Sequence, residues 1–246
     1  MKNNLAYREI KLIRLKKNKQ EKITDLVIRE SVLDISFNGE KISTLNYSNG
    51  GEKYLGVGFL FTEGFLKKKE EIIYLKYIQE KETIEVVTRN INASQKRKKR
   101  KELSLKIKKE KIKIKTEVIF QLMDDWQSRA KLFSLTGGTH SCALANREGS
   151  ILLFAEDISR YNTVDKILGE ALLQGLPLED KIIIGSFRIT SGIFTKMLRG
   201  RIPLIISRSA PTDRAIELAQ KMGVTLIGFA REDRMNIYTY PESIDI

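Results

Sequence analysis

Two side chains with potential for covalent chemistry lie two residues apart in this sequence. His140 and Cys142 are the only histidine and the only cysteine among the 246 residues. On a β-strand they would share one face, with Cα atoms about 6.6 Å apart. An imidazolium at that distance would lower the thiol pKa and give a nucleophilic thiolate, which makes Cys142 a candidate catalytic residue. The alternative, which the pattern favours, is a buried cysteine beside a turn histidine.

Arginines and glycines predict a binding site for an anion. Converging guanidinium groups suit a diphosphate, and the free N–H groups at the start of a helix accept phosphate oxygens. Nothing matches a P-loop or a dinucleotide-binding motif. We therefore expect a pocket for an anionic, nucleotide-bearing ligand. Its candidate residues are the strand-end arginines Arg188, Arg208, Arg231 and Arg234, the glycine pair Gly137 and Gly138 beside His140, and Ser209 and Thr212 before a helix.

Carboxylates form a further cluster of candidates. Glu156, Asp157 and Asp165 could take part in proton transfer as paired carboxylates. Helix capping by Asn162 and dipole pairing by Asp165 explain the same residues without catalysis, and the sequence leaves both interpretations open. With one histidine and one cysteine, a hydrolytic zinc site is poorly supported, and no metal site is predicted.

The apolar pattern of the second half indicates the elements that would position these residues. Strands that are apolar on both faces alternate with amphipathic helices, which is typical of a mixed or parallel sheet covered by helices. We expect a three-layer α/β fold whose ligands bind beyond the carboxyl ends of the strands. The expected strands are 181–187, 202–210 and 224–230, and the expected helices are 163–175 after a cap at Asn162, 188–200, and 212–223 beginning at Pro211.

The first half has a different pattern, so we expect a strand-rich N-terminal domain, 1–115, followed by an α/β domain, 116–246. Residues 33–37 alternate apolar and polar before an Asn38-Gly39 turn. The glycines in 55–66 suggest close backbone approach or a cap rather than a regular strand. A helical period over 118–133 predicts one amphipathic helix with Trp126 in the core.

The net charge of +13 is concentrated in one tract. Residues 96–115 contain 12 basic and 2 acidic side chains. They could contact nucleic acid or a membrane surface. The alternation of Leu103, Leu105 and Ile107 instead favours a solvated linker and a basic two-stranded ribbon protected by lysines. No aromatic residues are interleaved for base stacking, so nucleic acid is not favoured as a partner.

Composition excludes several classes of protein. No apolar run approaches the roughly 20 residues that a membrane-spanning helix needs. Charges interrupt every apolar stretch of the first 20 residues, so no signal peptide is predicted. A single cysteine excludes an internal disulfide framework. The expectation is a soluble cytoplasmic protein that makes no membrane contact.

Several motifs, taken in order, resemble the FdhD/NarQ family. The resemblance runs from about Ile23 to Thr239. It implies a cytidine-deaminase-like α/β domain after a smaller strand-rich domain. It also implies an accessory protein for formate dehydrogenase that binds the guanylated molybdenum cofactor (bis-molybdopterin guanine dinucleotide) and passes it sulfur from a cysteine desulfurase. The motifs are RESVLDISFNGE (29–40), LGVGFLFTEGF (55–65), FSLTGGTHSCAL (133–144), EDISRYNTVDKILG (156–169), SFRIT (186–190), SAPTDRAIELA (209–219) and LIGFAREDRMNIYT (226–239).

The resemblance also implies site residues and partners. The implied partners are a molybdoenzyme client such as formate dehydrogenase, a cysteine desulfurase and a second copy in a homodimer. The family's cofactor-binding segment maps onto a loop that the strand-end argument also selects. That segment corresponds to Phe229, Ala230, Arg231, Glu232, Asp233 and Arg234.

The chain departs from the family pattern in ways that bear on sulfur transfer. The family's Cys-x-x-Cys loop corresponds to residues 90–102, which contain no cysteine, so a persulfide cannot form there. Near the expected pocket, Ser159 and Phe187 replace glycines, Tyr161 replaces a histidine and Gly192 replaces a glutamate. We therefore predict a carrier that binds the guanylated cofactor without the usual persulfide. The alternatives are a sulfurtransferase that uses Cys142 and a nucleic-acid-binding module that uses residues 96–115.

Overall fold

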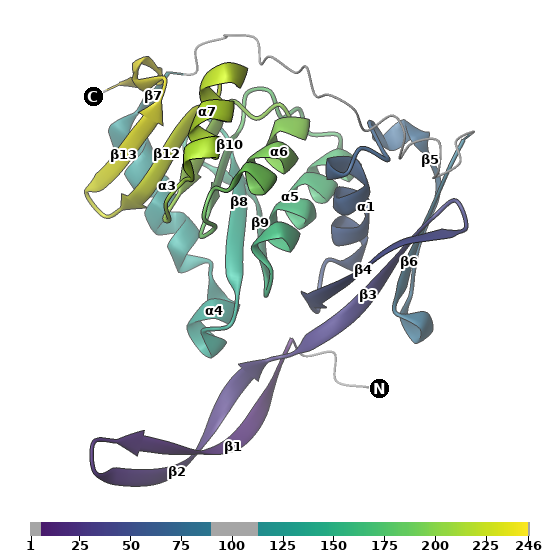
Figure 1. The fold of residues 1–246 in the computed structure, drawn as a ribbon, viewed down its shortest axis with the longest axis vertical. Coiled ribbons are helices and arrows are strands. Elements are labelled where there is room, and N and C mark those ends of the chain that lie inside the picture. Colours follow the sequence, from purple (N-terminus) through teal and green to yellow (C-terminus); the bar gives the residue numbers. More distant parts are fainter. Residues whose placement is uncertain (1–5, 90–112, 246) are drawn as a thin grey trace.

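The computed structural model describes residues 6–89 and 113–245 and contains two main sheets (Figure 1). The larger sheet has six strands in the order β13-β12-β11-β10-β8-β9. Its strands β10, β11 and β12 are parallel, and the other pairings are antiparallel, so the expected mixed sheet is confirmed. The strands are β8 (His140–Ala145), β9 (Ile151–Asp157), β10 (Ile182–Gly185), β11 (Leu204–Ser207), β12 (Thr225–Arg231) and β13 (Arg234–Thr239).

Helices cover both faces of this sheet (Figure 1). Alternate residues of a strand point to opposite faces, so each central strand must be apolar on both sides. Ile182 and Ile184 pack in one cluster with Leu122 of α3 (Thr116–Ser128). Ile183 packs in a second cluster with Val164 of α5. The helices of that second face are α5 (Arg160–Gln174), α6 (Ser191–Arg199) and α7 (Asp213–Met222).

The smaller sheet lies in the N-terminal part and has the order β4-β3-β6-β5. Leu33, Ile35 and Phe37 alternate toward its core and are fully buried. Asn38 and Gly39 both have positive φ, at 50° and 81°, which is the conformation of a tight hairpin turn. The predicted hairpin is therefore confirmed. The strands are β3 (Glu30–Phe37), β4 (Glu40–Ser48), β5 (Ile72–Ile78) and β6 (Thr83–Thr88).

Helix α1 (Glu52–Thr62) joins the two parts by packing directly on α5. A Cβ on Gly58 would lie 1.7 Å from the backbone oxygen of Asp165, and a Cβ on Gly169 would lie 2.0 Å from that of Tyr54. The close backbone approach predicted for 55–66 is therefore confirmed, and it occurs on a helix. One apolar cluster contains residues of the small sheet, α1, α5, α6 and α7.

Two predicted helix starts are wrong. Ser159 is the N-cap of α5, and Asn162 lies inside the first turn, where its side-chain amide donates to the backbone oxygen of Asn46. Pro211 precedes α7, whose N-cap is Thr212. In both cases the sequence cue lies within a few residues of the true boundary.

The single helix expected over 118–133 is also wrong, because the chain breaks at Ala130 (φ −75°, ψ 66°). Trp126 is in the core, as predicted, with 2% of its surface exposed. Phe133 instead lies on a separate short helix, α4 (Lys131–Thr136), and is 49% exposed.

A long hairpin projects from the body at the N-terminal side (Figure 1). It consists of β1 (Tyr7–Lys16) and β2 (Lys19–Ile28), which pair along their whole length. The basic ribbon predicted around 103–114 lies outside the described residues, except for Lys113 and Ile114. Ile114 belongs to β7 (Ile114–Lys115), which pairs with β14 (Ile244–Asp245). Within 6–89 and 113–245, no helix combines the length and apolar character needed to cross a bilayer.

Candidate functional site

A cleft of about 860 Å³ opens at the carboxyl end of the parallel strands, between the α3–α4 segment and the strand ends. Its position agrees with the rule that ligands of such sheets bind beyond the strand ends. Of the predicted site residues, Gly137, Gly138, His140 and Arg208 line it. The full lining is Asp124, Trp126, Gln127, Ser128, Ala130, Phe133, Ser134, Gly137, Gly138, Thr139, His140, Ser141, Ile158, Ser186 and Arg208.

Glu156 holds one wall of this cleft in place. Its carboxylate accepts hydrogen bonds from the backbone N–H groups of Leu132 (2.9 Å) and Phe133 (2.8 Å) and from the Thr139 hydroxyl (3.0 Å). A carboxylate at the first N–H groups of a helix is stabilising. Glu156 therefore fixes α4 and the glycine pair relative to β9.

The other candidate carboxylates are structural. Asp157 is fully buried and accepts hydrogen bonds from Asn162 Nδ2 (2.9 Å) and Ser48 N (3.3 Å), besides an ion pair with Lys166 Nζ (2.7 Å). Asp165 forms a similar buried pair with Lys196. These contacts use the carboxylate oxygens to join α5 to its neighbours. They leave the proton-transfer interpretation without support.

His140 is a neutral donor or acceptor in a positive environment. Its Nδ1 lies 3.1 Å from the hydroxyl oxygen of Ser186, which also accepts from Ser141 N (3.1 Å). Burial lowers the pKa of His140 below its usual 6.5, and the positive charges of Arg160 and Arg188 lower it further. The imidazole is therefore uncharged near neutral pH, and an anion bound beside it would favour its protonation.

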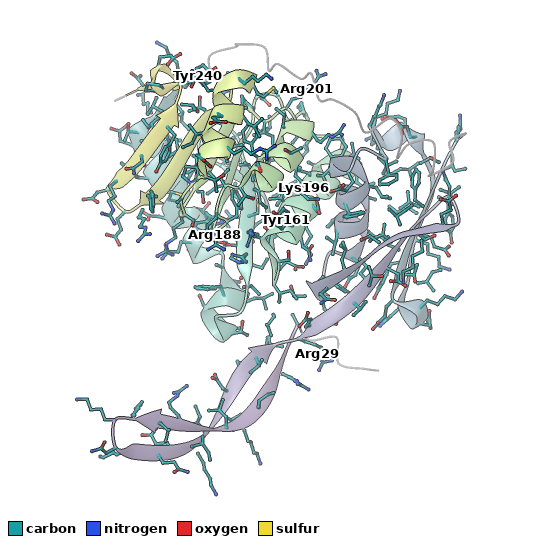
Figure 2. The ribbon with its side chains drawn as sticks, viewed as in Figure 1. Arg29, Tyr161, Arg188, Lys196, Arg201 and Tyr240 are labelled. Atoms are coloured by element: carbon teal, nitrogen blue, oxygen red, sulfur yellow. The ribbon has the colours of Figure 1, made fainter. Side chains whose placement is uncertain are left out.

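Three arginines surround this histidine from separate elements. Arg208 follows β11 and lines the cleft, Arg188 follows β10, and Arg160 begins α5. Figure 2 shows Arg188 and Tyr161 near one another at this edge, while Arg201 lies at the far end of the molecule. The Arg160 guanidinium stacks 5.2 Å from the centre of the Tyr161 ring. Of the four strand-end arginines, Arg208 lines the cleft and Arg188 is near enough to His140 to influence its charge, and the convergence of their guanidinium groups on one ligand stays a prediction.

Two buried N–H donors at this site lack an acceptor among the described residues. They are Nε1 of Trp126, which lines the cleft, and Nε of Arg160. Buried donors are almost always paired in native proteins, because an unpaired one costs about 1–3 kcal/mol.

The FdhD/NarQ family model matches residues 28–245. The chain belongs to the FdhD/NarQ family. It is 31% identical to the Sulfur carrier protein FdhD of Shouchella clausii over 92% of each chain, and 38% identical to the Protein FdhD of Methanocaldococcus jannaschii over 87% of this chain and 88% of that one.

A solved structure shares the fold of the whole chain. A putative formate dehydrogenase accessory protein from Desulfotalea psychrophila superposes with a TM-score of 0.84 at 25% identity, covering 98% of this chain and all of that one. The FdhD of Sulfolobus acidocaldarius is 32% identical over 98% of this chain and its own full length. The projecting β1–β2 hairpin lies almost entirely before the family match, which begins at residue 28.

The FdhD segment 229–234 lies on the same edge of the sheet as the cleft but does not line it. It spans the end of β12, the two-residue turn that follows and the first residue of β13, and Phe229 and Glu232 within it have positive φ (53° and 41°). Phe229 N donates to the Ser209 oxygen (3.1 Å), so this turn packs against the loop after β11. The Thr212 hydroxyl accepts from Ala215 N (3.4 Å) and caps its own helix. Ser209 and Thr212 thus also lie beside the cleft and not in it.

Two of the residues that depart from the family pattern, Tyr161 and Phe187, each lie directly beside a glycine. A Cβ on Gly192 would lie 3.1 Å from the hydroxyl oxygen of Tyr161, so the tyrosine occupies space next to that glycine. Phe187 is fully buried, and its ring lies where a Cβ on Gly185 would sit, at 2.1 Å. Each larger residue therefore fills space beside a glycine, next to the arginine-rich edge.

The structure does not support a catalytic role for Cys142. Its thiol is fully buried in the middle of β8, and burial raises its pKa well above the usual value. A buried protonated thiol is a poor nucleophile. The structure therefore favours the alternative interpretation, a buried cysteine, over a thiolate paired with His140.

Sequence reasoning missed the α3–α4 wall of the cleft. Trp126 was expected only in the core, yet its ring is both buried and part of the wall. Helical periodicity shows that a residue points inward but not what it faces. Among the described residues, no group of three or more His, Cys, Asp or Glu side chains is arranged to hold a metal ion.

Proposed function

We propose that this protein is an accessory protein for a molybdoenzyme such as formate dehydrogenase, and that it binds the guanylated molybdenum cofactor as cargo. Family membership supports the accessory role, since the D. psychrophila protein bears that description. The cargo is proposed to place its nucleotide part in the cleft. On this proposal the protein binds and presents the cofactor to its client.

The observation that carries the proposal is the lining of the cleft, which brings the Trp126 ring, the glycine pair and His140 together with the Arg208 guanidinium. A purine nucleotide offers a flat heterocycle for an aromatic wall and a diphosphate for guanidinium groups. The cleft volume of about 860 Å³ falls within the roughly 300–1,000 Å³ of typical small-molecule sites. The size of the cleft and the chemistry of its lining therefore fit a nucleotide.

Each side chain has a distinct task in this proposal. Arg208 and Arg188 hold the phosphates, and the turn 229–234 extends the same edge toward the rest of the cofactor. His140 starts neutral and takes up a proton when the anion binds, because the new negative charge raises its pKa. Phe133 and Trp126 form an apolar wall that excludes water from the heterocycle.

Sulfur transfer through this chain's own thiols is not part of the proposal. Close relatives are named sulfur carriers, but here residues 90–102 contain no cysteine and Cys142 is buried. A cysteine desulfurase as partner therefore stays a prediction. The nucleic-acid alternative concerns residues 96–115, which lie mostly outside the described residues, and no described contact favours it.

Two expectations about architecture stay predictions as well. One is the cytidine-deaminase-like character of the α/β part. The other is the division into domains 1–115 and 116–246. Helices α1 and α5, which fall on the two sides of this division, contribute to one apolar cluster. The boundary between the two expected domains therefore passes through a shared core.

We expect guanosine diphosphate to bind the wild-type protein and Arg208→Ala to weaken that binding at least about tenfold. Losing a charge-assisted hydrogen bond costs about 1.5–3 kcal/mol, and 1.4 kcal/mol is a factor of ten in affinity. Isothermal titration calorimetry measures both constants. Arg201→Ala is the matched control, because Arg201 is an exposed arginine at the other end of the molecule (Figure 2). No heat at millimolar nucleotide, or equal loss in both variants, would contradict the proposal.

A further inference from the structure

The hydroxyl group of Ser186 lies between the backbone of β8 and the imidazole of His140. Ser186 directly follows β10 and stands opposite Ser141, one residue beyond the last β8–β10 pair. Two such residues of an antiparallel pair normally exchange two backbone hydrogen bonds. Here Ser186 N donates to the Ser141 oxygen (3.0 Å), but Ser141 N donates to the Ser186 hydroxyl oxygen (3.1 Å). The hydroxyl oxygen therefore has a fixed position at the end of the ladder.

This hydroxyl group has one hydrogen to donate and an acceptor beside it. A serine hydroxyl donates once and accepts twice, and one of its lone pairs already takes the Ser141 N–H. Nδ1 of His140 lies 3.1 Å from the same oxygen. Within 6–89 and 113–245, no other hydrogen bond is made by Ser186 Oγ or by the His140 ring. Donation from Ser186 to Nδ1 satisfies both groups, whereas the reverse direction leaves the hydroxyl hydrogen without an acceptor among these residues.

We infer that Ser186 is a positioning residue that holds neutral His140 in the tautomer with its proton on Nε2, and that this Nε2–H donates to the ligand of the cleft. A neutral imidazole that accepts at Nδ1 carries its proton on Nε2. His140 lines the cleft, and Ser186 occupies the Nδ1 edge of its ring, so Nε2 is the nitrogen left for a ligand. Such a donor takes an oxygen acceptor, such as that of a phosphate. The donor role rests on the proposed function, whereas the tautomer itself does not.

The surroundings of the ring favour its neutral form. Burial and the positive charges of Arg160 and Arg188 lower the pKa of His140, and Asp157, which pairs with His140 across β9, acts in the opposite direction. Nε2–H is therefore a donor that requires no charge on the ring. The charged side chains of the elements around it are Arg160 of α5, Arg188 after β10, Arg208 after β11, and Glu156 and Asp157 of β9.

The inference also says where a proton goes when an anion binds. The lone pair available on the neutral ring is that of Nδ1, so a proton from solvent adds there and the N–H at Nε2 stays on the ligand. The Ser186 hydroxyl then turns from donor to acceptor at Nδ1. It has two lone pairs, so it keeps the hydrogen bond from Ser141 N. The group that faces the ligand is thus the same before and after proton uptake.

Nitrogen-15 NMR of the full chain tests the tautomer directly. His140 is the only histidine, so labelling with nitrogen-15 histidine gives the signals of one imidazole. Protonated and unprotonated ring nitrogens have well-separated chemical shifts, and couplings to the ring hydrogens identify each nitrogen. At alkaline pH without nucleotide, Nδ1 should be unprotonated and Nε2 protonated. A proton on Nδ1, or an equal mixture of the two tautomers, would overturn the inference.

Variants of Ser186 test its role in holding the ring. Ser186→Ala should move the Nδ1 signal toward that of a protonated nitrogen, because a ring without this donor samples both tautomers. Ser186→Thr keeps the hydroxyl and should restore the wild-type signals. Ser150→Ala is the matched control, because Ser150 is an exposed serine in the turn at the other end of β8. Wild-type His140 signals in Ser186→Ala, with unchanged circular dichroism, would show that Ser186 does not select the tautomer.

The donor role is tested with guanosine diphosphate as the probe. Ser186→Ala should weaken binding about three- to tenfold, the range for one neutral hydrogen bond, and Ser186→Thr should recover most of the affinity. In the wild-type complex the Nε2 signal should stay that of a protonated nitrogen, and loss of that proton would overturn the donor role. If the nucleotide does not bind at all, the proposed function fails while the tautomer measured without ligand stands, so the two failures are distinguishable.

Discussion

Gly58→Ala is expected to destabilise this protein more than the addition of a methyl group at any other position. The new Cβ would lie 1.7 Å from the Asp165 backbone oxygen, about half of an ordinary contact distance. The obstacle is backbone and cannot rotate away, so α1 and α5 must separate and open the core that they share. We expect a loss of at least about 3 kcal/mol, a large part of the 5–15 kcal/mol that holds a typical domain together.

We expect Gly58→Ala to lower the free energy of unfolding because the opposing contribution, the higher helix propensity of alanine, is small. Alanine gains only about 0.5–1 kcal/mol over glycine in a helix. Gly192→Ala on α6 is the matched control, since its Cβ would meet only the end of the Tyr161 side chain at 3.1 Å. Urea denaturation should show a greatly reduced midpoint for Gly58→Ala and a nearly unchanged one for Gly192→Ala. Equal midpoints for the two variants would refute the close α1–α5 contact.

Lys196→Met is expected to produce the second-largest loss. The Lys196 ammonium lies 2.9 Å from both oxygens of Asp165 and 2.9 Å from the Thr62 hydroxyl, and the pair is almost completely buried (Figure 2 labels Lys196). Methionine keeps the length of the side chain but leaves a buried carboxylate without its cation. Removing one partner of a buried pair costs about 3–5 kcal/mol. Chemical denaturation near neutral pH measures this loss.

The loss should depend on pH with a definite sign. Burial is the largest influence on the pKa of Asp165 and raises it, while Lys196 opposes that rise. Without Lys196 the folded state binds a proton more readily than the unfolded state, so stability increases as pH falls. The midpoint of Lys196→Met should therefore rise as the pH is lowered from neutrality toward the range in which an ordinary aspartate takes up its proton.

An exposed pair of the same chemistry provides the control. Lys41 lies 2.7 Å from Asp34, but its side chain is 60% exposed. Lys41→Met should cost less than about 1 kcal/mol, with no recovery at lower pH. If both lysine variants lost the same stability, the buried Asp165–Lys196 pair would not have the role assigned to it.

Much of the α/β part could be predicted from local patterns. Ile182–Ile184 and Leu204–Ile206 are apolar on both faces, and only a strand covered on both sides needs that pattern. The rule that ligands bind beyond strand ends selected Arg208, and the glycine pair was predicted separately as a source of backbone N–H donors; both line the cleft. The same rule also selected the segment 229–234, which does not line it.

The remaining features depend on contacts between distant segments. Asn162 resembles a cap in sequence, but its amide is used by Asn46 of the other sheet. Cys142 and His140 share a strand face, yet only the packing of β8 in the sheet shows that the thiol is buried. Trp126 has an inward helical position, and no local signal reveals that it borders a cleft. The sequence predicts which residues point inward, whereas tertiary packing decides what they meet.

Nucleotide binding in the cleft is tested most directly by tryptophan fluorescence. Trp126 is the only tryptophan in the chain and forms part of the cleft wall, so its emission reports occupancy of this site alone. Titration with guanosine diphosphate should change the emission saturably, with the same affinity as calorimetry, and Arg208→Ala should shift the curve to higher concentration. Calorimetric binding without any change in Trp126 emission would place the ligand elsewhere and contradict the account.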